Sequence, residues 1–306
     1  MEGRERAYEE EASEIRDREL GRGIHLTAHI HMVTPCRLSP PCKYCSISSS
    51  ILRIRRLRET LTDEELVKNV KRVEKKREIT SITLVGGSDI KGQDDLLIDV
   101  IKKVRSVTDI DVSIDVGAPI SIETLRILKE EGVTAIYSSI ETVNRQVFND
   151  AKPGDSLDLR IKLLHDASSA SIPVGTIIMN GLGSESDVMK SIDFMQQFRN
   201  VKYLYVSTFN PVRGTPWENR KAASINDSLR YVAYARHKLR KAHIGLADVE
   251  AEGSSVAGMV SQELSVGGGN TFAGMLVYKT IRKDYVGDLL LLEKMGYEIE
   301  IGRAHV

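Results

Sequence analysis

Hydrophobic positions along the chain follow two alternating periods, which predicts a regular succession of strands and helices. Short runs rich in Val, Ile and Thr stop at Gly, Pro, Asn or Asp, as buried strands do. We expect strands at 24–34, 80–85, 112–116, 134–140, 174–179, 203–209, 243–247 and 262–266. Between the strands, apolar residues three or four positions apart predict helices, the clearest at 94–105, 156–168, 185–198 and 225–241. Two further helices are expected to carry residues 275–279 and 285–295.

Local capping signals indicate where some helices begin and end. Thr62 and Glu65 form a capping box, in which the Thr hydroxyl caps the Glu65 amide and the Glu65 carboxylate reaches back. Ser121 is placed to cap another helix, and Gly132 to end it. Residues 5–20 alternate Glu and Arg densely and predict an exposed helix ahead of the first strand.

The alternation of about eight strands with helices predicts an α/β fold, a parallel (β/α)8 barrel of the TIM type. A doubly wound open sheet is the alternative. We expect residues 1–22 to form an N-terminal helical extension and residues 23–306 to form the barrel domain. In such a barrel the active site lies at the carboxyl ends of the strands, so polar and glycine residues there gain functional weight.

The three cysteines of the chain lie within ten positions, directly after the first predicted strand. Cys36, Cys42 and Cys45 form a C-x5-C-x2-C loop. Three thiolates on one loop suit a cubane [4Fe-4S] cluster that leaves its fourth iron open to another ligand. Zinc is one alternative, since His29 or His31 could supply a fourth protein ligand, and incidental free thiols are another.

Composition narrows the class of partner. The chain has 306 residues, 41% of them hydrophobic, and its 43 basic residues balance 43 acidic ones, so nucleic acid and membrane surfaces are not expected partners. We see neither a signal peptide nor an apolar run of the roughly 20 residues that span a bilayer, and expect a cytoplasmic protein. A basic run follows the cysteines and consists of Arg53, Arg55, Arg56 and Arg58. It forms either a solvated surface or a docking patch for an electron donor or another partner protein.

The cysteine loop resembles that of the radical S-adenosylmethionine (SAM) superfamily, whose common pattern is C-x3-C-x2-C with an aromatic residue before the last cysteine. Tyr44 matches that aromatic, whereas the first spacing is five rather than three. The chain is similar to the biotin synthase and [FeFe]-hydrogenase maturase group. The longer spacing resembles the radical SAM maturase of [Fe]-hydrogenase, which acts in biosynthesis of the iron-guanylylpyridinol cofactor.

The resemblance extends to further motifs at the predicted strand ends, and there it implies which residues bind SAM. Gly86 and Gly87 resemble the superfamily's Gly-Gly-Glu turn, although a plain turn would also explain them, and Ser88 stands in place of the Glu. Glu141 resembles the carboxylate that binds the polar rim of SAM, and Arg160 the arginine that pairs with the SAM carboxylate. Structural ion pairing or solvation are the alternatives for these two residues.

The remaining expected site residues follow the fifth and sixth strands. Ile178 and Met179 match a strand that packs against adenine, with core packing as the alternative. Asn180 stands where the family has an apolar residue, so its side chain needs a partner, and substrate is one candidate. Asn210 and Arg213 lie in a loop that resembles the Pro-x-x-Gly-Thr-Pro loop of the same group and are further candidates for substrate contact.

The resemblance implies reductive cleavage of SAM at a [4Fe-4S] cluster to a 5′-deoxyadenosyl radical, which then acts on a small-molecule substrate. An electron donor such as ferredoxin or flavodoxin is implied as a partner. With three cysteines in all, the chain has none left for a second cluster of the kind used in sulfur insertion. We therefore expect carbon-skeleton chemistry on a cofactor precursor, with another radical SAM mutase or lyase, or a non-catalytic iron-sulfur carrier, as alternatives.

Overall fold

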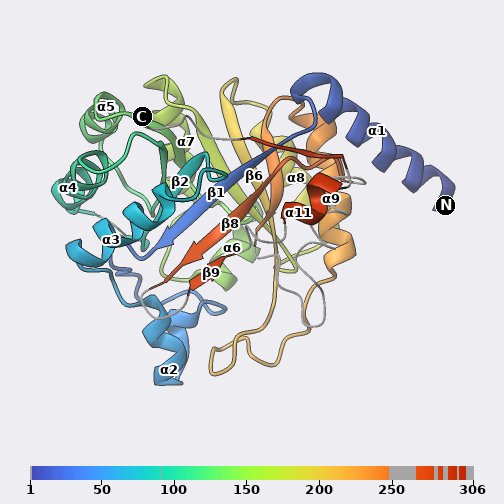
Figure 1. Ribbon diagram of the computed structural model, residues 1–306. Coiled ribbons are helices and arrows are strands. Elements are labelled where there is room, and N and C mark those ends of the chain that lie inside the picture. Colours follow the sequence, from blue (N-terminus) through green and yellow to red (C-terminus); the bar gives the residue numbers. More distant parts are fainter. Residues whose placement is uncertain are drawn as a thin grey trace.

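A parallel sheet curled around a central axis forms the body of the protein, with helices on its outer side (Figure 1). The computed structural model describes residues 2–89, 91–247, 267–278, 282–284, 289–294 and 296–300. Eight parallel strands are arranged in the order β7, β6, β5, β4, β3, β2, β1, β8. Their bounds are β1 Gly23–His31, β2 Ser81–Val85, β3 Asp111–Asp115, β4 Val133–Tyr137, β5 Val174–Asn180, β6 Val201–Thr208, β7 His243–Ala247 and β8 Thr271–Val277. The predicted barrel of the TIM type is confirmed.

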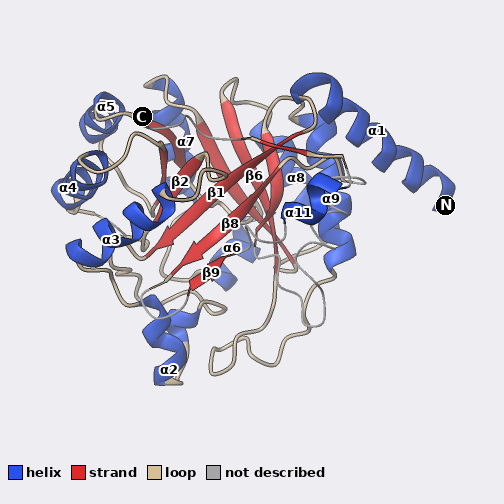
Figure 2. Cartoon of the chain, viewed as in Figure 1, coloured by secondary structure: helices blue, strands red, loops and turns tan. Residues whose placement is uncertain are grey.

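Amphipathic helices cover the outer face of the sheet (Figure 2). They are α3 Asp63–Glu74, α4 Asp94–Arg105, α5 Ile122–Glu130, α7 Leu157–Ser169, α8 Glu185–Met195 and α9 Ile225–Lys238. The short α6 (Arg145–Ala151) ends beside the cysteine loop, where Ala151 O accepts from Lys43 N at 2.9 Å. The helix α4 shows the principle, because Leu97, Ile101 and Val104 share its buried side. The predicted capping box at Thr62 opens α3, and Ser121 caps α5 as expected.

The two ends of the curled sheet meet where β8 lies beside β7 and β1. Asn270, just before β8, donates its backbone amide to Ile244 O of β7 at 2.9 Å and accepts from Ile244 N through its side chain at 3.0 Å. The eighth strand was expected at 262–266, which lies outside the described residues. The helix predicted for 275–279 is wrong at residues 275–277, since these belong to β8, whereas α11 (Leu289–Lys294) falls inside the helix predicted at 285–295.

The N-terminal helix α1 (Glu2–Leu20) lies along α9 at one side of the barrel (Figure 1). The Tyr8 ring stacks on His237 at 3.9 Å, and the buried Arg16 guanidinium donates to Gly269 O at 2.8 Å. The predicted boundary at residue 22 falls between this helix and β1 and stays a prediction. Among the described residues, every helix is too short or too polar to traverse a bilayer.

Smaller elements complete the chain. The segment after the cysteines forms one turn of helix, α2 (Leu52–Arg55), between two short 3-10 turns, Ser46–Ser48 and Arg56–Arg58. Strand β9 (Arg282–Asp284) pairs with β8, and the short β10 (Glu298–Ile299) pairs with β1. In Figure 1, α2 lies at the end of the molecule toward which the arrows of β1 and β8 point, which is the end where a barrel of this kind carries its active site.

Candidate active site

A cavity of about 220 Å³ opens at the carboxyl ends of the strands, beneath the cysteine loop. It brings together most of the residues that the sequence analysis singled out. Those that line it are Cys36, Cys42, Tyr44, Cys45, Gly86, Gly87, Ser88, Glu141, Arg160 and Met179. These residues come from loops after β1, β2 and β4, from β5 and from α7, so the barrel topology creates this site from distant parts of the chain.

The cysteine loop is held against its neighbours by close backbone contacts. A Cβ on Gly87 would lie 2.2 Å from the backbone of Cys36, and one on Gly154 would lie 2.2 Å from Pro40 O. The Pro-x-x-Gly-Thr-Pro loop holds the other end, because Gly214 has a φ of +78° and a Cβ there would lie 2.6 Å from Ser49 Oγ. Glycine is therefore required at three points around the loop, which fixes the positions of the thiols.

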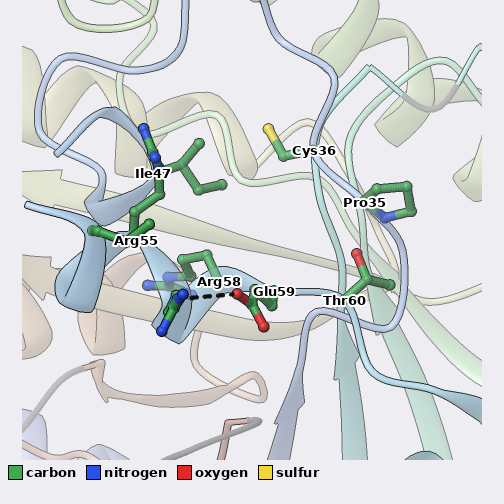
Figure 3. Close-up of a pocket in the computed structure, with 9 residues that line it drawn as sticks. Pro35, Cys36, Ile47, Arg55, Arg58, Glu59 and Thr60 are labelled. Atoms are coloured by element: carbon green, nitrogen blue, oxygen red, sulfur yellow. Dashed lines mark ion pairs between the residues drawn. The ribbon is translucent and has the colours of Figure 1, made fainter. Parts of the chain in front are cut away.

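A second cavity, of about 440 Å³, lies on the outer side of the same loop (Figure 3). Figure 3 shows Cys36 facing this cavity together with Ile47, Arg55 and Arg58. The ion pair drawn there ends at Glu59, whose Oε1 is 3.8 Å from the Nε of Arg56. Cys36 therefore lies between the inner pocket and a basic outer surface.

Gly86 and Gly87 leave no room for side chains. A Cβ on Gly86 would lie 2.1 Å from Thr34 Oγ1 and 2.7 Å from Val116 Cγ1. The turn thus presents bare backbone to the pocket beside the cysteines, as a glycine turn that lets a ligand approach closely must.

Glu141 follows β4 in a strained conformation, with a φ of +59°. Left-handed backbone at a residue other than glycine is costly and is concentrated at functional sites. Its Oε1 is 3.2 Å from Lys152 Nζ, whereas Oε2 is buried without a hydrogen-bond partner among the described residues. One carboxylate oxygen is therefore held by the protein and the other is left to accept hydrogen bonds from a ligand such as a ribose.

Arg160 is buried, and three protein groups bind its guanidinium. Nε donates to Asp155 Oδ2 at 2.8 Å, Nη1 to Ser139 O at 3.0 Å and Nη2 to Ser88 Oγ at 2.6 Å, while Nη2 is also 2.6 Å from Asp155 Oδ2. Although burial lowers the pKa of Arg160, the Asp155 carboxylate outweighs it and leaves that pKa above its usual range. Burial likewise opposes ionisation of Asp155, but Arg160 and Lys152 lower the pKa of its carboxyl group to about 2. Among the described residues these contacts leave one Nη1 hydrogen for the predicted contact with the SAM carboxylate.

Lys152 and Asp115 were missed by the sequence analysis. Lys152 is 3% exposed and pairs with Asp155 at 3.4 Å as well as with Glu141. It lies after α6 in a segment with no periodic pattern, so the sequence gives no signal for it. Asp115 ends β3 two residues before Gly117, which is the same strand-end signal that identified Glu141.

The apolar wall differs by one residue from the prediction. Ile177 and Met179 line the pocket, whereas Ile178 is fully buried in the core between sheet and helices. Successive side chains of a strand point to opposite faces, so Ile177, and not Ile178, faces the pocket beside the cysteines.

The three expected substrate residues do not line the pocket. The Asn180 amide donates to Ser224 O at 2.9 Å and Ser228 Oγ at 3.0 Å, so it is bonded to the start of α9. Asn210 and Arg213 are exposed on the loop after β6. The Arg213 backbone carbonyl accepts from Ser49 Oγ at 2.8 Å, which gives this loop a bracing role beside the cysteines.

The barrel interior is lined by neutral polar side chains. In the part of the chain that the structure describes, four buried polar atoms have no hydrogen-bond partner, namely Thr27 Oγ1, His29 Nε2, His31 Nε2 and Tyr137 Oη. Burial lowers the pKa of His29 to about 4 and holds the pKa of His31 well below its usual range. Arg58 Nη1 donates to His31 Nδ1 at 3.2 Å, so Nε2 carries the ring hydrogen and is an unused donor. A ligand with neutral polar groups would satisfy these atoms.

The residues present fit an iron-sulfur cluster with SAM. All three thiols are free and half-buried, and burial raises the pKa of Cys42 to about 12, so binding to iron would have to displace its proton. The glycine turn, which has no side chains, and Glu141 Oε2, which has no hydrogen-bond partner among the described residues, suit a nucleoside ligand beside the cysteine loop. Within the described ranges, no three or more His, Cys, Asp or Glu side chains are positioned to hold one metal ion.

Comparison with known proteins bears on the same region. The sequence profile of the radical SAM superfamily matches residues 30–195, more than half of the chain. A biotin synthase of Acetivibrio thermocellus is 25% identical over 294 residues, which cover 94% of this chain and 88% of that enzyme. An uncharacterized protein of Methanocaldococcus jannaschii is 29% identical over 228 residues, which cover 74% of this chain and only 60% of that protein.

Solved structures show the same fold at low identity. Methylornithine synthase (PylB) is similar with a TM-score of 0.81 at 21% identity, over 97% of this chain and 89% of that one. The FeFe-hydrogenase maturase HydG from Carboxydothermus hydrogenoformans is similar with a TM-score of 0.78 at 19% identity, over 96% of this chain and 71% of that one.

Proposed function

The chain belongs to the radical SAM superfamily, and on this basis we propose that it acts in biosynthesis of the iron-guanylylpyridinol cofactor of [Fe]-hydrogenase. Members of the superfamily are enzymes that use a [4Fe-4S] cluster and SAM. The step we assign to this chain is assembly of the carbon skeleton of the pyridinol. The observation that carries this assignment is the C-x5-C-x2-C loop on the pocket, together with the lack of any further cysteine in the chain.

The cysteine count separates this proposal from sulfur insertion. Cys36, Cys42 and Cys45 are the three cysteines of the chain, and all three line one cavity. A second cysteine-held cluster of the kind used in sulfur insertion would need further thiols. Chemistry on carbon, which needs no such sulfur donor, is therefore the better match to this chain.

The chain's own residues would bind and orient the cofactors. When bound, the cluster and SAM supply a 5′-deoxyadenosyl radical that abstracts hydrogen from the substrate. The three cysteines would hold the cluster, and Glu141 Oε2 would accept hydrogen bonds from the ribose. Arg160 would donate its remaining Nη1 hydrogen to the SAM carboxylate, and Met179, together with Ile177, would pack against the adenine.

The barrel interior supports a small uncharged substrate. The Tyr278 ring stacks on His31 at 4.2 Å, and the Tyr205 ring meets His29 edge-on at 5.8 Å. Rings of this kind favour a planar ligand, and the neutral His29 and His31 favour hydroxyl or carbonyl groups over full charges. A pyridinol precursor combines these properties.

An electron donor such as ferredoxin or flavodoxin would dock beside Cys36. Arg53, Arg55 and Arg56 are exposed next to the outer cavity, where a neighbouring apolar side chain, Leu52, is also 50% exposed. A basic patch with an apolar residue suits an acidic protein partner near the cluster. The reducing compartment in which clustered thiols persist is the cytoplasm, which remains our predicted location.

Deletion of the gene in its host, followed by mass spectrometry of the guanylylpyridinol cofactor, tests the proposal. We expect the cofactor to disappear and a plasmid copy of the wild type, but not of the Cys42→Ala variant, to restore it. An unchanged cofactor level would refute the assigned pathway and favour another radical SAM mutase or lyase. Failure of the purified protein to cleave SAM would instead favour an iron-sulfur carrier.

A further inference from the structure

The end of β1 carries a histidine whose ring is held by side chains from two other parts of the chain. His31 is the last residue of β1, lines the same cavity as the cysteines and is 9% exposed. Tyr278, directly after β8, stacks on its ring at 4.2 Å with an interplanar angle of 15°. On the other side, Arg58 Nη1 donates to His31 Nδ1 at 3.2 Å. The position and orientation of this imidazole are therefore fixed before any ligand binds.

The contact with Arg58 also determines where the ring hydrogen lies. A guanidinium group is always a donor, so His31 Nδ1 accepts and the hydrogen is on Nε2. Burial, with Arg58 and His29 acting in the same direction, holds the pKa of His31 well below its usual range, so the ring is neutral. Nε2 is buried and has no acceptor among the described residues. A buried donor without an acceptor is costly, so this N–H needs an explanation.

Arg58 joins the histidine to the cysteine loop. Its Nε donates to the Oγ of Ser46, the residue after Cys45, at 3.0 Å, and its guanidinium carbon lies 5.2 Å from the centre of the Tyr278 ring. A positive charge at Nδ1 polarises the imidazole and makes its Nε2 hydrogen a stronger donor. A neutral imidazole that polarises a carbonyl group through its N–H is a device that enzymes use.

The backbone after His31 is strained. Met32 has a φ of +65°, and its carbonyl oxygen accepts from Leu61 N at 2.9 Å, which ties the end of β1 to the segment that carries Arg58. Left-handed backbone at a residue other than glycine is concentrated at functional sites. The strained turn therefore keeps His31 and Arg58 in one arrangement.

We propose that His31 binds the substrate by donating a hydrogen bond from Nε2 to a carbonyl oxygen, while Arg58 fixes the tautomer that makes this possible. The inference rests on the proposed function and narrows its substrate class. A hydroxypyridine ring carries such an oxygen in its pyridone form. A substrate with an amino group at this point would place a donor against a donor and is disfavoured.

The test compares two uncharged ring probes that differ in one group. The probes are para-fluoroacetophenone and para-fluoro-α-methylstyrene, in which a methylene group replaces the ketone oxygen. Their dissociation constants are measured by fluorine NMR on the anaerobic, cluster-loaded and unreduced protein with SAM present. The proteins are the wild type, His31→Leu, His31→Gln, Arg58→Met and, as a control, His165→Leu, whose imidazole is exposed on α7. Iron content and circular dichroism verify that each variant is folded and loaded.

We expect His31→Leu to lower the preference for the ketone over the alkene by about fivefold or more, because one buried hydrogen bond is lost. His31→Gln keeps an N–H donor and should lose less. Arg58→Met should also lower the preference, since the ring can then carry its hydrogen on either nitrogen. His165→Leu should leave both constants unchanged.

The same preference in the wild type and His31→Leu, or a wild type that does not bind the ketone, would overturn the inference. An unaltered preference in Arg58→Met would overturn the role given to Arg58. None of these results would touch the proposed function, which is tested by the cofactor content of the deletion strain. An unchanged cofactor level in that strain would refute the assigned pathway, whereas the hydrogen bond from His31 would still be measured by the probes.

Discussion

Asp115 should destabilise the folded protein, and Asp115→Asn should therefore stabilise it. The pKa of its carboxyl group rises from 3.8 to about 6 on folding. Since one pKa unit corresponds to about 1.4 kcal/mol, the ionised carboxylate costs at most about 3 kcal/mol at neutral pH. Asp115 is partly exposed to the pocket it lines, so we expect Asp115→Asn to raise the free energy of unfolding by about 1 to 3 kcal/mol.

The pH dependence has a definite sign. Because the folded pKa lies above the unfolded one, the folded protein binds more protons between about pH 4 and 6, and its stability falls as the pH rises through this window. The charged side chains that act on Asp115 are Arg160, Glu141 and Lys152. Urea unfolding followed by circular dichroism at pH 5 and 7.5, without SAM, measures the effect. Equal stability of both proteins, or a larger difference at pH 5 than at pH 7.5, would refute the reasoning. Asp111→Asn serves as the matched control, because Asp111 opens the same strand, is exposed and pairs with Lys202 at 3.5 Å.

Two further changes test the construction of the site. Lys152→Met should lower the free energy of unfolding by about 3 to 5 kcal/mol, because it removes the cation that lies between the buried carboxylates of Glu141 and Asp155. A loss below about 1 kcal/mol in urea unfolding would contradict the ion-pair geometry. Gly87→Ala should prevent normal closure of the cysteine loop and reduce bound iron severalfold, since its Cβ would lie 2.2 Å from the Cys36 backbone. Gly92→Asn is the control, because a Cβ there would meet no described atom within 4 Å, and this variant should bind as much iron as the wild type. A full complement of iron in Gly87→Ala would refute the claim that Gly87 is needed for closure of the cysteine loop.

One test concerns the surface beside Cys36. The double variant Arg55→Glu/Arg56→Glu should slow reduction of the cluster by an acidic ferredoxin at low salt by about tenfold or more, because steering of a charged partner depends on such patches. Reduction by dithionite, which needs no docked protein, should be far less affected. Equal rates with ferredoxin would show that the donor docks elsewhere.

Much of the fold could be predicted because the strands and helices carry clear local signals. The strands β1 to β7 fall where alternation and strand-ending residues placed them, and the capping residues Thr62 and Ser121 act as expected. The helix expected at 275–279 fails because a short apolar run fits a buried strand and a helix face equally well. Pairing with β1, which decides between them, is a long-range interaction that the local sequence does not contain.

The site was predictable where residues follow strand ends and was not where it depends on side-chain direction. Gly86, Gly87 and Glu141 meet at the pocket because parallel strands end at one rim. Ile178 and Asn180 point away from it, since a shift of one residue along β5 exchanges the faces of the sheet. The partners of the buried ions are set by the docking of α7 and the loop before it, which no sequence pattern indicates.

The most direct test of the account is SAM cleavage by the protein itself. The protein is reconstituted without oxygen, reduced with dithionite and given SAM, and iron and 5′-deoxyadenosine are quantified beside a Cys42→Ala control. We predict about four irons per chain, with 5′-deoxyadenosine formed by the wild type and not by the variant. A loaded cluster that leaves SAM intact under every reductant, or zinc in place of iron, would contradict the central claim.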